Sequence, residues 1–231
     1  LAIDELSENG LMADKTMNTT LHMMEAYTEL YLADHNPKVL ERLKFQLDLT
    51  YDKIYDKAGS KLLVFFDKNM NVIGDIHSYG HDIEATWLID RACEVIGEPE
   101  LTAKFAEMNR AIVRNIANIA YDKASGSLLN ERDKDKINTW RIWWVQAEAV
   151  IGFMNGYQKH YGGAEYFEIS SNVWNFIQEH IVDKRPGGEW HSQVDDNWKF
   201  AEFKPVVDPW KCPYHNGRMC LEMMRRLAEN G

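Results

Sequence analysis

Four short polar clusters recur along this chain, and each one opens a stretch of helical periodicity. The clusters end at positions 18, 81, 141 and 216, so successive clusters lie 63, 60 and 75 residues apart. Each interval has room for one further helix that runs back, which is the pattern of stacked helical hairpins. In such a stack every second helix starts at the same end, so we expect the four clusters to face one mouth. The repeat therefore predicts a single active site.

Apolar residues recur at helical spacing through most of the chain. The pattern in residues 83–96 ends at Gly97, with Pro99 just beyond, as is typical of a helix end. Short β-prone pieces are expected to form small hairpins on the connections, with a turn at 67–71. No linker is evident, so residues 1–231 are expected to form one all-α domain. The expected helices are 21–31, 38–56, 83–96, 101–121, 141–161, 164–180 and 213–229, and the β-prone pieces are 62–66, 72–73 and 189–191.

Composition narrows the class of protein. The 231 residues are 45% hydrophobic and 12% aromatic, which supports a packed core and argues against disorder. The formal net charge of −10 argues against a nucleic-acid or anionic-membrane partner. No apolar run approaches the roughly 20 residues of a membrane span, and residues 1–20 lack the apolar core of a signal peptide. Three cysteines without a CxxC pair are typical of reduced thiols, so a cytoplasmic location is expected.

The second and fourth clusters carry histidines at helix starts. His81 and Glu84 are three residues apart and share one helical face, where a carboxylate favours the imidazolium and holds the ring. Gly80, just before, allows close backbone approach. A proline suits the first turn of the fourth helix, which places His215 where N–H groups are exposed, and Trp210 is a candidate stacking platform. The alternative is that these residues only cap or cover their helices.

The first and third clusters add further polar and aromatic groups. Asn18 and His22 are four residues apart and share a helical face. In the third cluster, three tryptophans offer aromatic faces for a sugar ring, and Gln146 and Glu148 could bond to hydroxyl groups. The alternative is that the tryptophans belong to the core and that the histidine is structural. The tryptophans are Trp140, Trp143 and Trp144.

The same residues include types that bind metals. His22, His81, Glu84 and His215 could in principle bind a divalent cation, but HExxH and HxH motifs are absent. GxGxxG, P-loop and GxSxG motifs are absent too, so neither a metal nor a cofactor is expected. Four other histidines are expected at the surface, namely His77, His160, His180 and His191.

Two imidazoles from different helices that face one cavity suit a particular reaction. One can take a proton from a carbon next to a carbonyl, and the other can return a proton to the opposite face. Histidine has the near-neutral pKa that such a base needs. Epimerisation and isomerisation through an enediol therefore come first among the reaction types.

The motifs that contain these residues resemble those of the N-acylglucosamine 2-epimerase superfamily, and among its branches they look most like the cellobiose 2-epimerases. The resemblance is collinear from about Leu11 to the C-terminus, with four motifs in order at compatible spacing. These motifs are KTMNTTLHMMEAYTELY, SYGHDIEATWLI, WWVQAEAVIGF and WKCPYHNGRMCLEM.

The resemblance implies an (α/α)6 barrel with the site where the inner helices begin. It implies an isomerase that, without a cofactor, epimerises C2 of the reducing-end glucose in β-1,4-linked disaccharides such as cellobiose and lactose. The ring would open first and a cis-enediolate would follow. By motif match, His81 and His215 would exchange the C2 proton, and Glu84 would support His81. The sugar would be held by Asn18, His22, Trp210 and either Trp143 or Trp144.

The length of the chain departs from the family pattern. Six hairpins of this spacing need roughly 400 residues, whereas this chain has room for about three and a half. It therefore resembles the C-terminal part of the barrel, with apolar faces left exposed. We expect it to be inactive alone or to be completed by a missing N-terminal half or a second chain. The alternative functions are an N-acylglucosamine 2-epimerase, an aldose–ketose isomerase of the same fold, and a non-catalytic sugar-binding fragment.

Overall fold

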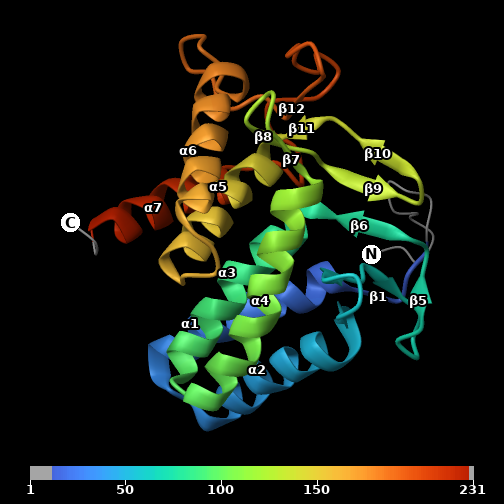
Figure 1. Cartoon of the computed structure of the whole chain (residues 1–231), viewed down its shortest axis with the longest axis vertical. Helices are drawn as coiled ribbons and strands as arrows, with labels where there is room; N and C mark the ends of the chain where they lie inside the picture. The colour runs from blue at the N-terminus through green and yellow to red at the C-terminus, as the bar shows by residue number, and fades with distance from the viewer. Residues whose placement is uncertain (1–11, 229–231) are drawn as a thin grey trace.

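Seven α-helices form most of the structure, a computed structural model that describes residues 12–228 (Figure 1). The first six helices form consecutive hairpins, and a short connection joins the two helices of each hairpin. The last helix, α7, has no helical hairpin partner within these residues. The prediction of a mainly helical fold built from hairpins is confirmed. The helices are α1 (Met17–Asp34), α2 (Pro37–Leu49), α3 (Tyr79–Ile96), α4 (Pro99–Ile119), α5 (Trp143–Gln158), α6 (Ala164–Phe176) and α7 (Tyr214–Ala228).

Local sequence sets the helix ends. Gly97 closes α3 with a φ of 73°, a left-handed conformation that glycine adopts without strain, and its N–H donates to the carbonyl of Cys93. Pro99 then occupies the first turn of α4, where no N–H is needed. Asn36 caps α2 by accepting a hydrogen bond from the N–H of Lys38 at 3.0 Å. The short connections that follow from these stops force the paired helices to run antiparallel.

Packing contacts separate the helices into an inner and an outer row. Helices α3 and α5 are buried on nearly every side, whereas α4 buries one face and exposes the other. The inner helices α1, α3, α5 and α7 pack in that order, and α2, α4 and α6 lie outside them. Helices α3 and α5 approach closely at Gly152, where an added Cβ would lie 2.7 Å from the carbonyl oxygen of Ile83. The fold is therefore an open arc of helical hairpins.

Short strands lie in the connections between the helices. As predicted, Phe65–Phe66 pairs with Val72–Ile73 around a turn, and the Asp67 carboxylate accepts hydrogen bonds from the N–H groups of Asn69 and Asn71. The β9–β10 hairpin beside β6 was not predicted (Figure 1). The strands are β1 (Lys15–Thr16), β2 (Tyr55–Asp56), β3 (Lys61–Leu62), β4 (Phe65–Phe66), β5 (Val72–Ile73), β6 (Ile76–Ser78), β7 (Tyr121–Asp122), β8 (Ser127–Leu128), β9 (Glu131–Asp133), β10 (Lys136–Asn138), β11 (Arg141–Ile142) and β12 (Gln193–Val194).

A repeated turn follows each outer helix. The sequences YDKAGSKLL at 55–63, YDKASGSLL at 121–129 and VDKRPGGEW at 182–190 align with one another. In each, the aspartate carboxylate accepts a hydrogen bond from the N–H two residues later, at 3.1 Å for Asp56, 3.0 Å for Asp122 and 3.0 Å for Asp183. The turn leads the chain back toward the start of the next inner helix.

One histidine was placed wrongly from the sequence. His77 was expected at the surface, but only 3% of it is exposed. Its Nε2 lies 2.7 Å from Oδ2 of Asp82, and Oδ1 of Asp82 accepts a hydrogen bond from the N–H of Leu62. This buried pair fixes β6 against the start of α3, because a buried imidazole needs a polar partner.

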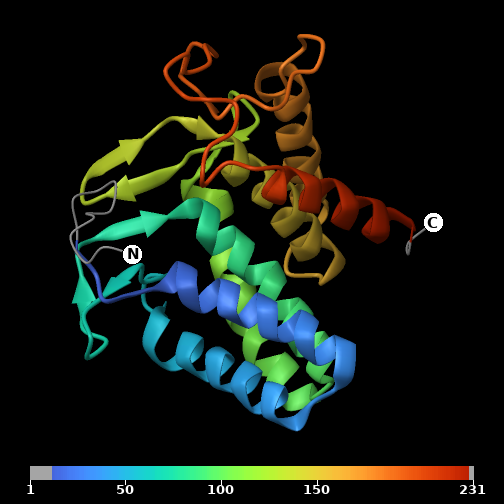
Figure 2. The same cartoon turned by 180° about the vertical axis from the view of Figure 1, so that it is seen from behind.

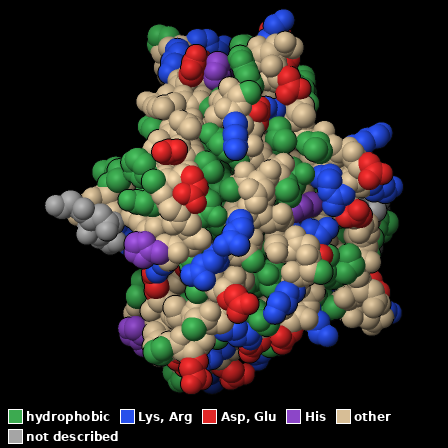
Figure 3. Space-filling model, in the orientation of Figure 1, with side chains coloured by type: hydrophobic (Ala, Val, Ile, Leu, Met, Phe, Trp, Pro, Cys, Tyr) green, Lys and Arg blue, Asp and Glu red, His purple; other side chains and the backbone are tan. Residues whose placement is uncertain are grey.

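The outer surface mixes charges of both signs over the face drawn in Figure 3. None of the helices between residues 12 and 228 is both long enough and apolar enough to cross a membrane. The signal-peptide prediction concerned residues 1–20, of which 1–11 lie outside the described part.

The edge of the arc at α7 is apolar and uncovered, as an open arc predicts. Leu221, Met224 and Leu227 are exposed by 71%, 69% and 57%. Next to them, a groove of about 470 Å³ between α6 and α7 is lined mainly by apolar side chains such as Trp174 and Met223. Full-length helical arrays bury such faces against the next hairpin.

Candidate active site

The inner helices meet at the guanidinium of Arg218. This side chain of α7 donates to Glu25 of α1 at 2.5 Å, to Glu84 of α3 at 2.5 Å and to Glu148 of α5 at 2.7 Å. In Figure 2, α1 (blue) and α7 (red) lie on the same face of the molecule. The repeat predicted this convergence, although Arg218 itself was not singled out. One partly buried cation therefore joins all four inner helices.

His215 is held by a buried carboxylate. Its Nδ1 lies 2.8 Å from Oε1 of Glu148, and Oε2 of Glu148 accepts a hydrogen bond from Trp87 Nε1 at 2.9 Å. Burial opposes ionisation of Glu148, but Arg218 and His215 outweigh it and hold the pKa of this carboxyl below its ordinary value. An ionised Glu148 accepts only, so Nδ1 of His215 carries a proton and Nε2 is left for a ligand.

His81 is held differently, by a neutral hydroxyl. Its Nδ1 lies 2.7 Å from Oγ of Ser78. Burial, together with the nearby His22 and His215, lowers the pKa of His81 well below its ordinary value. His81 therefore remains neutral near pH 7 and can accept a proton.

Trp144 lies beside both imidazoles. The centroid of its indole is 4.6 Å from that of His81 and 5.5 Å from that of His215. The indole reaches this position because residue 80 is glycine: an added Cβ would lie 2.6 Å from Cη2 of Trp144. Close approach at Gly80 was predicted, and the approaching group is this side chain. Trp143 is 9% exposed and packs into the core, so Trp144 is the tryptophan that borders the site.

Glu84 shares a helix with His81, but its contacts lie elsewhere. Its Oε1 accepts from Arg218 and lies 3.9 Å from Nδ1 of His215, so the expected pairing with His81 is replaced by contacts to α7. Burial and the neighbouring Glu148 raise the pKa of Glu84 to about 7. Its Oε2 is buried and has no hydrogen-bond partner within residues 12–228. A carboxyl with such a pKa and a free oxygen is suited to proton exchange.

Asn18 and His22 both lie on α1, and His22 contacts residues beside Arg218. Nδ1 of His22 is 3.0 Å from Oε2 of Glu25, and its ring centroid is 6.1 Å from that of Tyr214. Oδ1 of Asn18 is buried and finds no partner among the described residues. Both side chains therefore keep a polar atom for a ligand.

Trp210 is not brought to the other site residues. It is 80% exposed on the segment before α7. The next residue, Lys211, is buried, pairs with Glu189, and its ammonium lies 5.6 Å from the ring centroid of Trp143. This anchor fixes the base of the segment and leaves the Trp210 ring in solvent.

Two residues predicted to bond sugar hydroxyls instead form hydrogen bonds within the protein. Gln146 is fully buried and clamps the backbone of Leu128, accepting from its N–H at 2.9 Å and donating to its carbonyl at 2.8 Å. Glu148 is bonded to Trp87, His215 and Arg218. The prediction for these two side chains was wrong because it considered only their helix and not what packs against it.

The cluster has the composition of a possible metal site. One ligand atom each from Glu84, Glu148 and His215 lie within 4.8 Å of one another. The guanidinium of Arg218 contacts both carboxylates, so it supplies the positive charge that a cation would bring. A cation at this position would therefore compete with the guanidinium for the same carboxylate oxygens.

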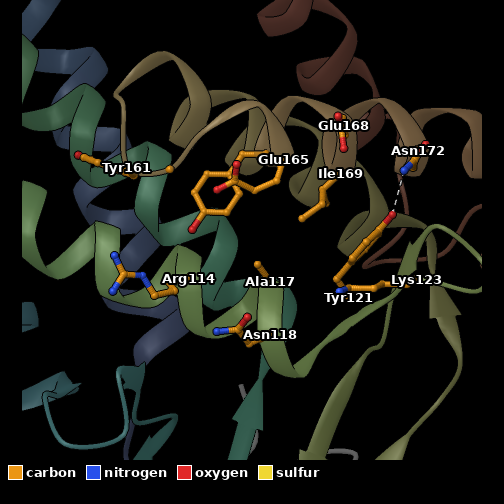
Figure 4. A pocket seen from close by; sticks show the side chains of 12 residues that line it. Arg114, Ala117, Asn118, Tyr121, Lys123, Tyr161, Glu165, Glu168, Ile169 and Asn172 are labelled. Atoms are coloured by element: carbon orange, nitrogen blue, oxygen red, sulfur yellow. Dashed lines mark hydrogen bonds between the residues drawn. The ribbon is translucent and has the colours of Figure 1, made fainter.

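A second hollow, of about 560 Å³, lies between α4 and α6 (Figure 4). The dashed line in Figure 4 marks the hydrogen bond that Nδ2 of Asn172 donates to the hydroxyl of Tyr121 at 3.0 Å. Glu165 accepts the N–H of Gly163, which lowers the pKa of this exposed carboxyl. No histidine is among the residues that line this hollow, so we place the candidate site at the inner helices.

Sequence spacing held signals for the residues that were missed. Arg218 follows His215 by three positions and Glu25 follows His22 by three, so each lies on the same helical face as a predicted histidine. Both pairs were visible in the motifs.

Comparisons with known proteins show the family of this chain. Residues 3–216 match the family N-acylglucosamine 2-epimerase (GlcNAc 2-epimerase). The cellobiose 2-epimerase of Ruminococcus albus is 56% identical over 223 residues, which are 96% of this chain and 57% of that protein. That of Dictyoglomus turgidum is 46% identical over 222 residues, covering 96% and 56%. The chain thus spans a little over half the length of these curated relatives.

Solved structures give the same result. A sugar epimerase from a ruminal bacterium superposes with a TM-score of 0.94 at 56% identity, over 98% of this chain and 58% of that one. The cellobiose 2-epimerase of Bacillus thermoamylovorans gives 0.90 at 41% identity, over 96% and 56%. A D-mannose isomerase gives 0.78 at 20% identity and shows the fold alone. The arc is thus an incomplete (α/α)6 barrel, and the chain belongs to the N-acylglucosamine 2-epimerase family.

Proposed function

We propose that this protein epimerises C2 of the reducing-end glucose in β-1,4-linked disaccharides, with cellobiose and lactose as substrates. The observation that carries the proposal is the pair of imidazoles, His81 from α3 and His215 from α7, beside the single indole of Trp144. The relatives named cellobiose 2-epimerase support the substrate class. The product would be the mannose epimer of the same disaccharide.

The chemistry requires an open-chain sugar, because only the free aldehyde makes the C2 hydrogen acidic. One imidazole takes the C2 proton and becomes an imidazolium, and the electron pair moves into a cis-enediolate. The other imidazole, protonated, gives a proton to C2 from the opposite face and becomes neutral. Protons and charge balance in this transfer, which leaves each imidazole in the protonation state from which the other started. The imidazoles return to their starting states by proton exchange with water, and the reaction needs no redox cofactor.

The remaining residues have proposed roles around this exchange. Glu84, with a pKa of about 7 and a free oxygen, would pass protons to and from the sugar oxygens during ring opening. Asn18 and His22 would hold the sugar hydroxyls and the charge that develops on oxygen. Trp144 would support the reducing-end ring, and Trp210 would have to fold inward from solvent to reach the second ring.

The rest of the barrel is part of the proposal. The chain covers 57% of the first relative, and α7 ends the arc with exposed apolar side chains. We propose that turnover requires helices that cover this edge, from a longer polypeptide or from a second chain. Co-expression with the unmatched part of the Ruminococcus albus relative tests this point, and equal activity with and without that part would refute it.

Proton NMR of lactose or cellobiose in D2O with the purified protein tests the activity. We expect deuterium at C2 together with the mannose epimer, and loss of both in His81→Ala and in His215→Ala with the fold intact. Near-normal turnover in either variant would refute the histidine pair. Parallel incubations with mannose and N-acetylglucosamine distinguish a related isomerase or epimerase. Binding of the disaccharide without C2 exchange, even with the barrel completed, would indicate a sugar-binding protein instead.

A further inference from the structure

Ser78 occupies the N-cap position of α3 but does not cap the helix. A serine at this position normally accepts a hydrogen bond from the N–H two or three residues later, which stabilises a helix by about 1 kcal/mol. At Ser78 the backbone is extended, with φ −88° and ψ 102°, yet its side chain makes no capping bond. Its Oγ lies 2.7 Å from Nδ1 of His81 instead. The hydroxyl of Ser78 therefore bonds to the His81 side chain and leaves the N–H groups at the start of α3 without a side-chain cap.

The position of this hydroxyl is fixed by the backbone that carries it. Ser78 is 6% exposed and is the last residue of β6, paired in register with Glu131 of β9. The next residue, Tyr79, donates its N–H to the carbonyl of Asn130 at 3.3 Å. One position before, His77 is locked to Asp82. Oγ of Ser78 thus lies on a backbone that is held by a strand on one side and by the buried His77–Asp82 contact on the other.

We propose that Ser78 is a positioning residue for His81: its Oγ accepts the Nδ1–H of the imidazole and so keeps Nε2 unprotonated and directed at the substrate. This inference rests on the proposed function, in which His81 receives the C2 proton. When Nε2 takes up that proton, Nδ1–H is unchanged and the same hydrogen bond persists. If Ser78 donated to Nδ1 instead, Nε2 would already carry the only proton of the neutral ring. It could not take one from C2 until the hydroxyl had turned and the proton had moved to Nδ1. A bond that serves both protonation states adds no such reorganisation to the barrier.

The two histidines then differ in the group that accepts their Nδ1–H. His215 donates Nδ1–H to an ionised carboxylate, Glu148, whereas His81 donates to a neutral hydroxyl. A carboxylate partner stabilises an imidazolium much more than a hydroxyl does. In the resting protein His81 would therefore be the neutral base, ready to take the first proton.

Nitrogen–proton correlation spectra of the histidine rings test the inference without any need for turnover. The His81→Gln variant identifies the His81 resonances. We expect wild-type His81 to be neutral at pH 7 in one tautomer, protonated at Nδ1. In Ser78→Ala the population should shift toward the Nε2-protonated form that a free histidine side chain prefers, and Ser78→Thr, which keeps the hydroxyl, should retain the wild-type pattern.

Ser170→Ala is the matched control. Ser170 is also a buried serine, but its hydroxyl donates to the carbonyl of Val150 at 2.8 Å, away from the histidines. It should leave the His81 spectrum unchanged. An Nε2-protonated His81 in the wild type, or an unchanged His81 tautomer in a folded Ser78→Ala, would overturn the inference.

Exchange at C2 separates this inference from the proposed function. In protein that catalyses exchange, Ser78→Ala should lower kcat about ten- to a hundredfold with little change in KM, as when other partners that orient a functional histidine are lost. Ser78→Thr should recover most of the rate. If no sugar is turned over but the tautomer shifts as stated, the activity assignment fails and the positioning by Ser78 stands. If exchange occurs and the tautomer does not depend on Ser78, the activity assignment stands and the positioning by Ser78 fails.

Discussion

Nδ1 of His215 and Oε1 of Glu148 are 2.8 Å apart, and Glu148 is completely buried between the inner helices. A carboxylate in this position fixes which ring nitrogen carries the proton. It also stabilises the imidazolium that forms when Nε2 receives a proton. The geometry matches the general pattern in which a catalytic base is oriented by a third group.

Replacement of Glu148 by glutamine should therefore abolish most of the activity while preserving shape. The amide is neutral and can leave His215 in the wrong tautomer, so we expect a fall in the rate of C2 deuterium exchange of about 10²- to 10⁴-fold. Glu165→Gln makes the same change at an exposed position on α6 and serves as the control. Exchange by Glu148→Gln at a rate close to that of Glu165→Gln would contradict the role of Glu148.

Arg218→Met should destabilise the fold. The substitution leaves Glu84 and Glu148 buried without their shared cation, and removal of one partner from a buried ion pair costs about 3–5 kcal/mol. For a chain of this size we expect a fall of roughly 10 °C in the unfolding temperature, measured by circular dichroism. Arg114→Met, at an exposed arginine of α4, should change it little. Equal unfolding temperatures for the two variants would show that Arg218 does not hold the inner helices together.

The pKa of Glu84 predicts how stability depends on pH. It is about 7 in the folded protein, against an ordinary value of 4.5. Between these values the folded protein keeps a proton that the unfolded chain releases, so stability falls as pH rises through the window. The slope approaches about 1.4 kcal/mol per pH unit. Denaturant unfolding of Glu84→Gln across this window should show a smaller fall than the wild type, and parallel curves would be evidence against the shifted carboxyl.

Much of the fold could be predicted from the sequence because its determinants are local. Helical periodicity, Gly97 and Pro99 located the hairpins, and the spacing of the polar clusters indicated that the inner helices start at one end. The repeated aspartate turns after the outer helices were equally visible, as the aligned YDK sequences at 55 and 121 show, but they were missed. Recognising them would have predicted the β2–β3 and β7–β8 hairpins.

The site was predicted only as far as single helices allow. The positions of His81 and His215 followed from their motifs, but their partners did not. Glu148 is 67 residues from His215, and Glu25 is 193 residues from Arg218. Such contacts arise from the packing of helices, on which periodicity carries no information. Local spacing was misleading for Glu84, which follows His81 by three positions yet bonds to Arg218. His77 was misplaced for the same reason, since its burial depends on Asp82 and on the strand that covers both.

Gly80→Ala tests the contact on which the site depends most directly. The added Cβ would lie 2.6 Å from the Trp144 indole and 2.7 Å from Cγ2 of Val145, so one of these side chains must move. Overpacking of this kind costs about 1–3 kcal/mol, and displacement of Trp144 would also disturb both imidazoles. We expect a lower free energy of unfolding together with slower C2 exchange.

Gly217→Ala provides the matched control for that substitution. Gly217 lies in the first turns of α7, and an added Cβ there meets nothing within 4 Å. Alanine should stabilise this helix by about 0.5–1 kcal/mol, because glycine loses more backbone freedom on folding. Chemical denaturation of the two variants should therefore give changes of opposite sign. A Gly80→Ala protein as stable and as active as Gly217→Ala would mean that the indole of Trp144 is not held against α3, and the arrangement of the two histidines around it would have to be revised.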